Sequence, residues 1–333
     1  KDRVVHVYVA DKVSEYRLAH DKKWVAFVHK YNTFVNPFAD NGQKVSIGPK
    51  MLSLPVKQLS ARSGNYMTWS PNNDSVGWSH GPRYFERSLD QAFDFLAEPN
   101  AQLPEPLNEG MDLSFKKKSD KPNRYTAIVG GKIVSMRDAD NQEEVFENGV
   151  VLIKDNRIEA VGKSADIMIP DDALIINAEG KTVIPGLIDT HAHGAQGRSE
   201  IIPEQNWSQY SNLAFGVTTI HDPSNDTTEI MAAGELQRAG QRIAPRTYST
   251  GTILYGAEAL GFKSIINDYD DAYYHVQRLK DLGAISVKSY NQPRRDQRQQ
   301  VLVAAKKQEM MVVPEGGGKF QQNISMLVDG HTG

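Results

Sequence analysis

The chain has 333 residues, 39% hydrophobic residues and a formal net charge of −3 at pH 7. Its length allows two or three domains with a sizeable core, and its weakly acidic balance disfavours nucleic acid or an acidic membrane surface as a partner. Cysteine is absent, which excludes disulfides, thiol nucleophiles and cysteine-ligated zinc. A small-molecule partner is therefore expected, and any metal ion must be held by histidine, carboxylate or a modified lysine.

The first hundred residues predict short β-strands separated by turns. LAHDKKWVAF, from Leu18, and WSPNNDSVGW, from Trp69, share one pattern at a spacing of 51 residues, which fits one propeller blade. The pattern resembles the TolB-like β-propeller repeat, although His20 and Lys22 replace its Pro and Gly. Two blades cannot close a propeller, which needs about four. We predict a partial β-propeller-like all-β segment over residues 1–95, with further blades upstream.

The middle of the chain predicts a linker followed by a second β-rich domain. Residues 96–123 carry four prolines and a solvated lysine run without periodicity, as linkers do. From Arg124 onward, strand-like phrases surround a hairpin signal at Asp155-Asn156. These phrases predict a small β-sandwich over residues 124–186.

The last part of the chain alternates strand-like and helix-like segments, which is typical of βαβ units. Five phrases predict strands, and two, TTEIMAAGELQRAGQ and DDAYYHVQRLKDLG, predict helices. A (β/α)8 barrel has eight strands, so residues 187–333 predict an incomplete TIM-like barrel. The expected fold class is multidomain, with a chain truncated at both ends. The strand phrases are VIPGLIDTHAHG, GVTTIHDPS, PRTYSTG, AISVKSYN and MMVVPEGGG.

Three phrases, GKIVSM, VLIKDNRIEAVG and KTVIPGLIDTHAHG, carry a family resemblance. From about Tyr125 to its end, the chain resembles the amidohydrolase superfamily, in particular its imidazolonepropionase-like metal-dependent hydrolases. The resemblance implies a distorted (β/α)8 barrel flanked by a β-sandwich. It also implies one or two divalent metal ions, zinc above all, at the carboxyl ends of the barrel strands.

His191 and His193 are the predicted metal ligands of the first barrel strand. On a strand, alternate side chains share a face and lie about 7 Å apart, and neutral imidazole suits zinc. The resemblance matches both histidines to the first-strand ligands of the superfamily. The alternative is that the two histidines only pack at the end of a strand.

Lys288 and Glu315 are the other predicted metal ligands. Lys288 falls on the predicted fourth strand, where part of the superfamily has a carboxylated lysine that bridges two metal ions. Glu315 stands where many relatives have a histidine, and a glutamate can ligate zinc or take a proton from metal-bound water. The alternatives are a Lys288–Glu315 salt bridge and a Lys288 that binds a substrate carboxylate.

Asp222 closes the second predicted strand and is, with Glu315, a candidate catalytic residue. A residue at the carboxyl end of a barrel strand faces the active site, although Asp222 alternatively caps the turn before Pro223. The last-strand aspartate that serves the family as general base is absent. Activity is therefore expected of a longer parent protein rather than of the chain as given.

The predicted function is hydrolysis of a C–N bond, other than a peptide bond, by metal-activated water. The expected substrate is a cyclic amide, an amidine or a small peptide-like molecule. Two alternatives stay open: a metallo-dipeptidase of the same superfamily, and a propeller-based binding protein with an inactive barrel. A periplasmic or secreted protein that forms homo-oligomers is expected.

Overall fold

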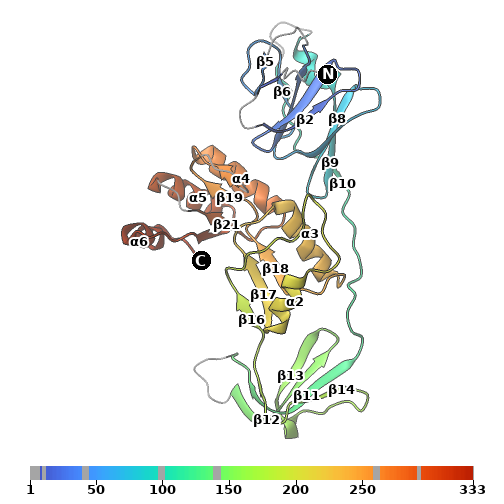
Figure 1. The fold of residues 1–333 in the computed structure, drawn as a ribbon, viewed down its shortest axis with the longest axis vertical. Coiled ribbons are helices and arrows are strands. Elements are labelled where there is room, and N and C mark those ends of the chain that lie inside the picture. The colour runs from blue at the N-terminus through green and yellow to red at the C-terminus, as the bar shows by residue number, and fades with distance from the viewer. Residues whose placement is uncertain are drawn as a thin grey trace, which may run out of the picture. The chain divides into compact units, whose positions relative to one another are not determined.

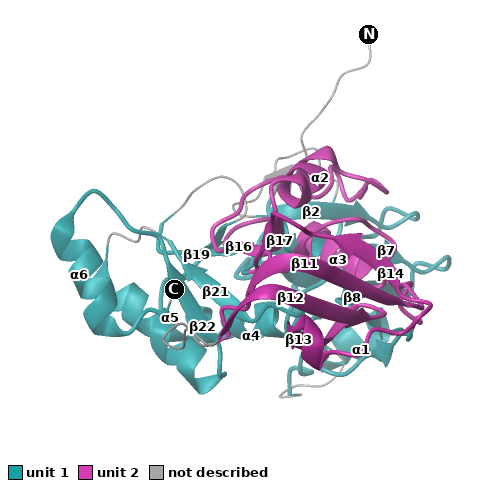
Figure 2. Cartoon of the chain, turned by 90° about the horizontal axis from the view of Figure 1, so that it is seen from below, with its two compact units in different colours: residues 1–116, 226–228, 250–333 teal, residues 117–225, 229–249 magenta. Residues whose placement is uncertain are grey.

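The computed structural model describes residues 8–9, 13–39, 45–96, 102–137, 144–257, 263–290 and 294–332. It consists of two compact units (Figure 2). Unit 1 contains residues 1–116, 226–228 and 250–333, and unit 2 contains residues 117–225 and 229–249. Within the described ranges, no helix is long and apolar enough to cross a membrane. The division into four domains stays a prediction.

Unit 1 begins with two four-stranded antiparallel sheets, which lie at the blue end of the chain in Figure 1. Their central strands are rich in aromatic and β-branched residues, which favour strands, and a shared core packs Trp69, Trp78 and Phe85 with smaller apolar side chains. The first sheet has the order β2 (Val13–Leu18), β3 (Trp24–His29), β4 (Asn32–Pro37), β6 (Lys57–Gln58). The second has the order β10 (Met111–Asp112), β9 (Arg83–Ser88), β8 (Ser75–His80), β7 (Asn65–Trp69). A separate parallel pair joins β1 (Tyr8–Val9) to β5 (Val45–Ser46).

The two sheets repeat one backbone pattern. Strands β8 and β9 begin 51 residues after β3 and β4. The turn before each pair has a residue with positive φ, 59° at Lys22 and 62° at Asn73. Equivalent backbone hydrogen bonds close both turns, from Ala19 N to Trp24 O and from Ser70 N to Ser75 O. The two copies of the sequence repeat therefore fold alike, and their assignment to a propeller stays a prediction.

Part of the predicted linker pairs with the second sheet and with the segment that follows β6 of the first. Met111 and Asp112 form β10 against β9, and the backbone N–H of Leu107 donates to the carbonyl of Leu59 at 2.8 Å. The proline-rich composition did not reveal these contacts, because they join segments that are far apart in the sequence. A short helix, α1 (Leu89–Phe93), precedes this stretch and is capped by Ser88.

Unit 2 contains a five-stranded sheet with the order β13-β12-β11-β14, in which β15 also pairs with β11. The turn predicted at Asp155-Asn156 joins β12 to β13, since Lys154 pairs with Arg157 across it and Asp155 has a positive φ of 56°. The sheet confirms the predicted hairpin. Its strands are β11 (Tyr125–Val134), β12 (Val145–Lys154), β13 (Arg157–Lys163), β14 (Leu174–Asn177) and β15 (Thr182–Val183).

All five predicted parallel strands form, but they belong to two sheets. The first three make the sheet β16-β17-β18 of unit 2, and the others join the sheet β20-β19-β21-β22 of unit 1. Two strands of three residues each, β19 and β20, were not predicted. Closure into a barrel stays a prediction. The strands are β16 (Leu187–Asp189), β17 (Val217–Asp222), β18 (Arg246–Ser249), β19 (Ile253–Tyr255), β20 (Lys263–Ile265), β21 (Ser286–Ser289) and β22 (Met311–Pro314).

Helices separate most of these strands, as the βαβ pattern predicts. The two predicted helices form as α3 and α4, and α4 is capped by Asp268, whose side chain accepts from the backbone N–H of Asp271 at 2.9 Å. Acidic residues in the first turn of α4 and basic residues in its last turn complement the helix dipole. The helices are α2 (Trp207–Ala214), α3 (Thr227–Arg238), α4 (Tyr269–Asp281), α5 (Arg295–Lys307) and α6 (Phe320–Asp329).

Candidate metal centre and adjoining pocket

The predicted ligands His191 and His193 lie in a loop rather than on a strand. Strand β16 ends at Asp189, whose side chain accepts a hydrogen bond from the backbone N–H of His191 at 3.0 Å. Such a local side-chain bond competes with strand pairing and favours a turn. The expectation that strand alternation aligns the two histidines is therefore wrong. The loop nevertheless brings the two imidazole rings together, with centroids 5.0 Å apart and planes at 77°.

Asp222 faces His193 from the end of β17. Its Oδ1 lies 3.4 Å from His193 Nδ1, and Ser224 Oγ lies 3.4 Å from the same nitrogen. Only 1% of Asp222 is exposed, and burial raises the pKa of its carboxyl above the ordinary value, while hydrogen bonds from Asn225 and Ser224 oppose the rise. The Ser224 N–H donates to Oδ1 at 2.9 Å, so Asp222 both holds a turn and contacts a candidate ligand.

The loop that carries the histidines is tied to the segment around the end of β17. The N–H of Ala192 donates to the carbonyl of His221 at 3.0 Å. The amide of Asn225 donates to the carbonyl of Gly194 at 2.9 Å and to Asp222 Oδ2 at 2.7 Å. These bonds place both histidines at the carboxyl edge of the β16-β17-β18 sheet, where active sites of parallel sheets lie.

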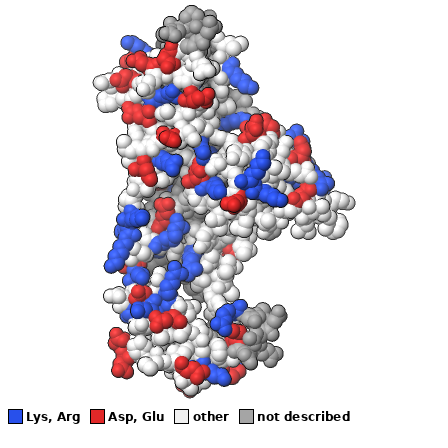
Figure 3. Space-filling view, turned by 180° about the vertical axis from the view of Figure 1, so that it is seen from behind, with Lys and Arg blue, Asp and Glu red and all other residues white. Residues whose placement is uncertain are grey.

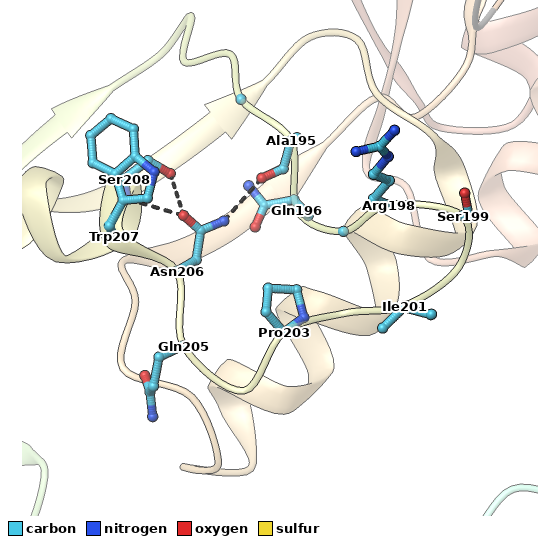
Figure 4. A pocket seen from close by; sticks show the side chains of 12 residues that line it. Ala195, Gln196, Arg198, Ser199, Ile201, Pro203, Gln205, Asn206, Trp207 and Ser208 are labelled. Atoms are coloured by element: carbon cyan, nitrogen blue, oxygen red, sulfur yellow. Dashed lines mark hydrogen bonds between the residues drawn. The ribbon is translucent and has the colours of Figure 1, made fainter.

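A cavity of about 760 Å³ begins directly after His193. The connection from β16 to α2 forms it, with residues 194–199, 201, 203 and 205–208 in its lining (Figure 4). Sequence reasoning missed this pocket, because the segment has no hydrophobic periodicity and its shape depends on loop conformation. The run of Gly, Gln and Pro around an isolated Trp207 was its one visible signal.

In unit 1, Lys288 and Glu315 form an ion pair. Lys288 lies on β21 opposite Val313 of β22, and Glu315 follows β22, where its N–H donates to the carbonyl of Ser289 at 3.0 Å. Lys288 is only 1% exposed, so its ammonium group needs a partner of opposite charge. Of the alternatives for Lys288, the structure contains the salt bridge.

One aromatic ring, that of Tyr290, lies near the Lys288 ammonium of this ion pair. Lys288 Nζ lies 5.5 Å from the ring centroid of Tyr290, and Lys263 Nζ lies 5.6 Å from the same ring. Tyr255 meets Tyr290 edge to face at 5.3 Å. Ring faces attract cations, so this environment adds to the stabilisation of an unmodified, charged Lys288.

His191 and His193 are candidate ligands of a metal ion in unit 2. Catalytic zinc takes three protein ligands and keeps one position open. His191 and His193 supply two neighbouring imidazoles, and the contact of His193 Nδ1 with Asp222 leaves Nε2 for coordination. In the described part of the chain, no three His, Asp or Glu side chains form a group able to hold a metal. Unit 2 therefore fits two ligands of a divalent metal site.

Comparison with known proteins gives short sequence matches. No protein-family model matches the chain. It is similar to enamidase of Eubacterium barkeri, with 37% identity over 92 residues, 27% of this chain and 22% of that enzyme. It is also similar to imidazolonepropionase of Geobacillus sp. strain WCH70, with 31% identity over 97 residues, 27% of this chain and 23% of that enzyme. The matches span less than a quarter of these curated relatives.

Comparison with solved structures gives a longer match. A Bifidobacterium longum protein assigned as a prolidase superposes with a TM-score of 0.52 at 21% identity, over 63% of this chain and 53% of that one. This likeness concerns the fold. The sequence relatives support a likeness to the amidohydrolase superfamily.

Proposed function

We propose that this chain is part of a metal-dependent amidohydrolase that hydrolyses a C–N bond. The observation that carries the proposal is the pair His191 and His193 at a parallel-sheet edge, with the buried Asp222 against His193. The sequence relatives, an enamidase and an imidazolonepropionase, support this reaction class. Since the matches cover small parts of these enzymes, the activity of the whole protein stays a proposal.

His191 and His193 would hold a divalent ion, for which zinc is the proposed choice. A bound ion of this kind lowers the pKa of a water molecule from about 16 toward 7 and polarises a substrate carbonyl. Asp222 Oδ1, 3.4 Å from His193 Nδ1, is placed to accept from the Nδ1–H tautomer of the ring and to hold its orientation. We therefore propose that Asp222 acts through His193, as a positioning residue, rather than on the substrate as first expected.

Glu315 and Lys288 are the other proposed metal ligands. Glu315 supplies a carboxylate able to ligate a metal ion or to accept a proton. Lys288 is the proposed bridging ligand in a carboxylated form, and in its unmodified form it holds Glu315 through the observed ion pair. These two roles of Lys288 are separable, because only carboxylation depends on carbon dioxide.

The remaining proposals concern the surroundings of the enzyme. The substrate class is a cyclic amide, an amidine or a small peptide-like molecule. The TolB-like turn pattern supports a propeller assignment for the first sheets and a periplasmic or secreted location. A homo-oligomer is proposed from the resemblance to barrel enzymes, which commonly form one. A partial (β/α)8 barrel is proposed for the parallel strands.

The second candidate function is a metallo-dipeptidase, which the likeness to the prolidase fold favours. The discriminating assay follows ring opening of dihydrouracil and hydantoin beside cleavage of Ala-Pro and Ala-Ala, in the protein at its full natural length with added zinc. Ring opening that disappears in the His191→Ala/His193→Ala variant supports the first function. Cleavage of dipeptides alone supports the second, and no metal-dependent turnover of either class contradicts both.

A further inference from the structure

A largely buried glutamine lines the pocket beside the histidines. Gln196 lines the cavity, and only 2% of this residue is exposed. Among the described residues, nothing forms a hydrogen bond with its side chain, although a glutamine amide offers two donors and one acceptor. The polar atoms of Gln196 are not among the fully buried unpaired atoms of the described residues, so they reach the open space of the cavity. A ligand with a complementary donor and acceptor would satisfy them.

Apolar side chains line the same cavity. Trp207 and Ile201 are 82% and 74% exposed, and Pro203 is also exposed. Figure 4 shows Ile201 and Pro203 along the loop that closes one side and Trp207 at the start of α2. In Figure 4 the ring of Trp207 lies on the other side of Asn206 from Pro203 and Ile201, so apolar side chains flank the polar groups of the cavity. Such a mixed lining is typical of a small-molecule site.

Backbone hydrogen bonds hold the loop around the cavity in a defined conformation. Arg198 and Ile201 exchange backbone hydrogen bonds of 3.0 and 3.1 Å, and the two residues between them, Ser199 and Glu200, both have positive φ, 52° and 66°. Such backbone is strained without glycine and persists only where other contacts impose it. The carboxylate of Glu229 supplies one such contact, because it accepts a hydrogen bond from the backbone N–H of Glu200 at 2.9 Å.

A second tie fixes the other side of the cavity. Asn206 donates through Nδ2 to the carbonyl of Ala195 at 3.0 Å (Figure 4), while its Oδ1 accepts from Ser208 N at 3.0 Å and from Ser208 Oγ at 2.7 Å. Gly197 allows the chain to close, because a Cβ there would lie 2.7 Å from the carbonyl oxygen of Ile201. The pocket is thus preformed, which lowers the entropy cost of binding.

We infer that this pocket is a substrate subsite with two parts. Gln196 pairs with an amide group of the substrate, and the surface of Ile201, Pro203 and Trp207 receives an aromatic or bulky apolar substituent. The inference rests on the proposed function and deepens it, since it narrows the substrate to an amide or imide with an apolar ring.

The test measures binding rather than turnover. Calorimetric titration of the full-length protein uses 5-benzylhydantoin and hydantoin, which share the imide and differ in the ring. Gln196→Leu is expected to weaken binding of both compounds about tenfold, and Trp207→Ala to weaken 5-benzylhydantoin about tenfold and leave hydantoin unchanged. The matched control is Gln241→Leu, the same change at an exposed position, with no expected effect. Gln196→Met, an unbranched apolar side chain of nearly the same shape and without a charge, repeats the test in a variant more certain to fold.

The same titrations in the His191→Ala/His193→Ala variant separate the two levels of the proposal. If the histidine variant still binds 5-benzylhydantoin more tightly than hydantoin, and neither it nor the unmodified protein turns over substrate, the proposed function is contradicted and the subsite is retained. No binding of 5-benzylhydantoin to the unmodified protein, or equal binding by Gln196→Leu and Gln241→Leu, overturns the subsite whatever the enzyme hydrolyses.

Discussion

Asp222 is the residue whose role the structure changes most. Its carboxylate is buried and lies 3.4 Å from His193 Nδ1, so its effect on a metal ion passes through that ring. Asp222→Asn is expected to weaken zinc affinity by about ten- to a hundredfold, as loss of a carboxylate behind a ligand histidine does. Competition with a chromogenic chelator measures this change. The exposed Asp172→Asn serves as the control, and equal affinity in both variants would argue against the positioning role.

The ion pair of Lys288 and Glu315 is expected to contribute to the stability of unit 1. Glu315→Ala leaves the buried ammonium of Lys288 without its partner, which is expected to cost roughly 3 kcal/mol of the free energy of unfolding. Lys288→Met replaces the buried cation with an apolar side chain of similar volume and is expected to be nearly neutral. Urea denaturation at pH 7 compares the two. Equal losses in both variants would show that the ion pair does not set the stability here.

The sequence predicts these side chains better than it predicts their setting. The phrase around His191 and His193 marks both residues, and the Lys288–Glu315 pair follows from strand positions alone. The turn at Asp189 and the largely buried Gln196 were not predictable, because a strand ends where a local side-chain bond outcompetes pairing. Loop cavities depend on backbone angles that composition does not specify.

The turn between Arg198 and Ile201 has a strained backbone that is expected to lower the stability of the protein. Its two central residues, Ser199 and Glu200, occupy the conformation in which Asn-Gly is most favourable. The double variant Ser199→Asn/Glu200→Gly is expected to raise the free energy of unfolding by about 1 kcal/mol. A thermal unfolding scan measures the gain. A lower melting temperature would mean that the native side chains contribute more than the strain costs.

Helix α4 meets the first two sheets of unit 1 through Asp281. Burial alone raises the pKa of this carboxyl, but hydrogen bonds from His80, Gln277 and Arg62 outweigh burial and hold the pKa at about 2. Arg62 also forms an ion pair with it. The pKa is therefore lower in the folded than in the unfolded state, and the stabilisation is present above about pH 4 and lost as the pH falls toward 2.

Urea denaturation between pH 5 and 2 tests this linkage. The unmodified protein is expected to lose stability more steeply over this range than Asp281→Asn, which has no carboxyl to protonate at that position. If the free energy of unfolding fell equally with pH in both proteins, the contacts of Asp281 would not contribute to the pH dependence of stability. Asp172→Asn again provides a matched exposed control.

Long elements were predictable and short ones were not. The 51-residue repeat and the two helices α3 and α4 follow from turn chemistry and amphipathic spacing. Strands β19 and β20 have three residues each, too few for a periodic signal, and the pairing of β10 with β9 depends on contacts distant in sequence.

For the molecule as a whole, the sequence predicts the strands and helices but not how they divide between the two compact units. The parallel strands divide after β18, where the chain passes from unit 2 to unit 1. No local pattern marks that division, because it reflects packing between distant segments. Acidic and basic side chains lie interspersed on the face shown in Figure 3, in keeping with a net charge of only −3.

The proposed function depends on His191 and His193 holding a divalent metal ion. Elemental analysis for zinc, iron, manganese and nickel tests it most directly, on the full-length protein and on its His191→Ala/His193→Ala variant. One or two equivalents of metal are expected in the unmodified protein, and they are expected to be lost in the folded variant. Equal metal content in the two proteins, or none in either after incubation with zinc, would contradict it.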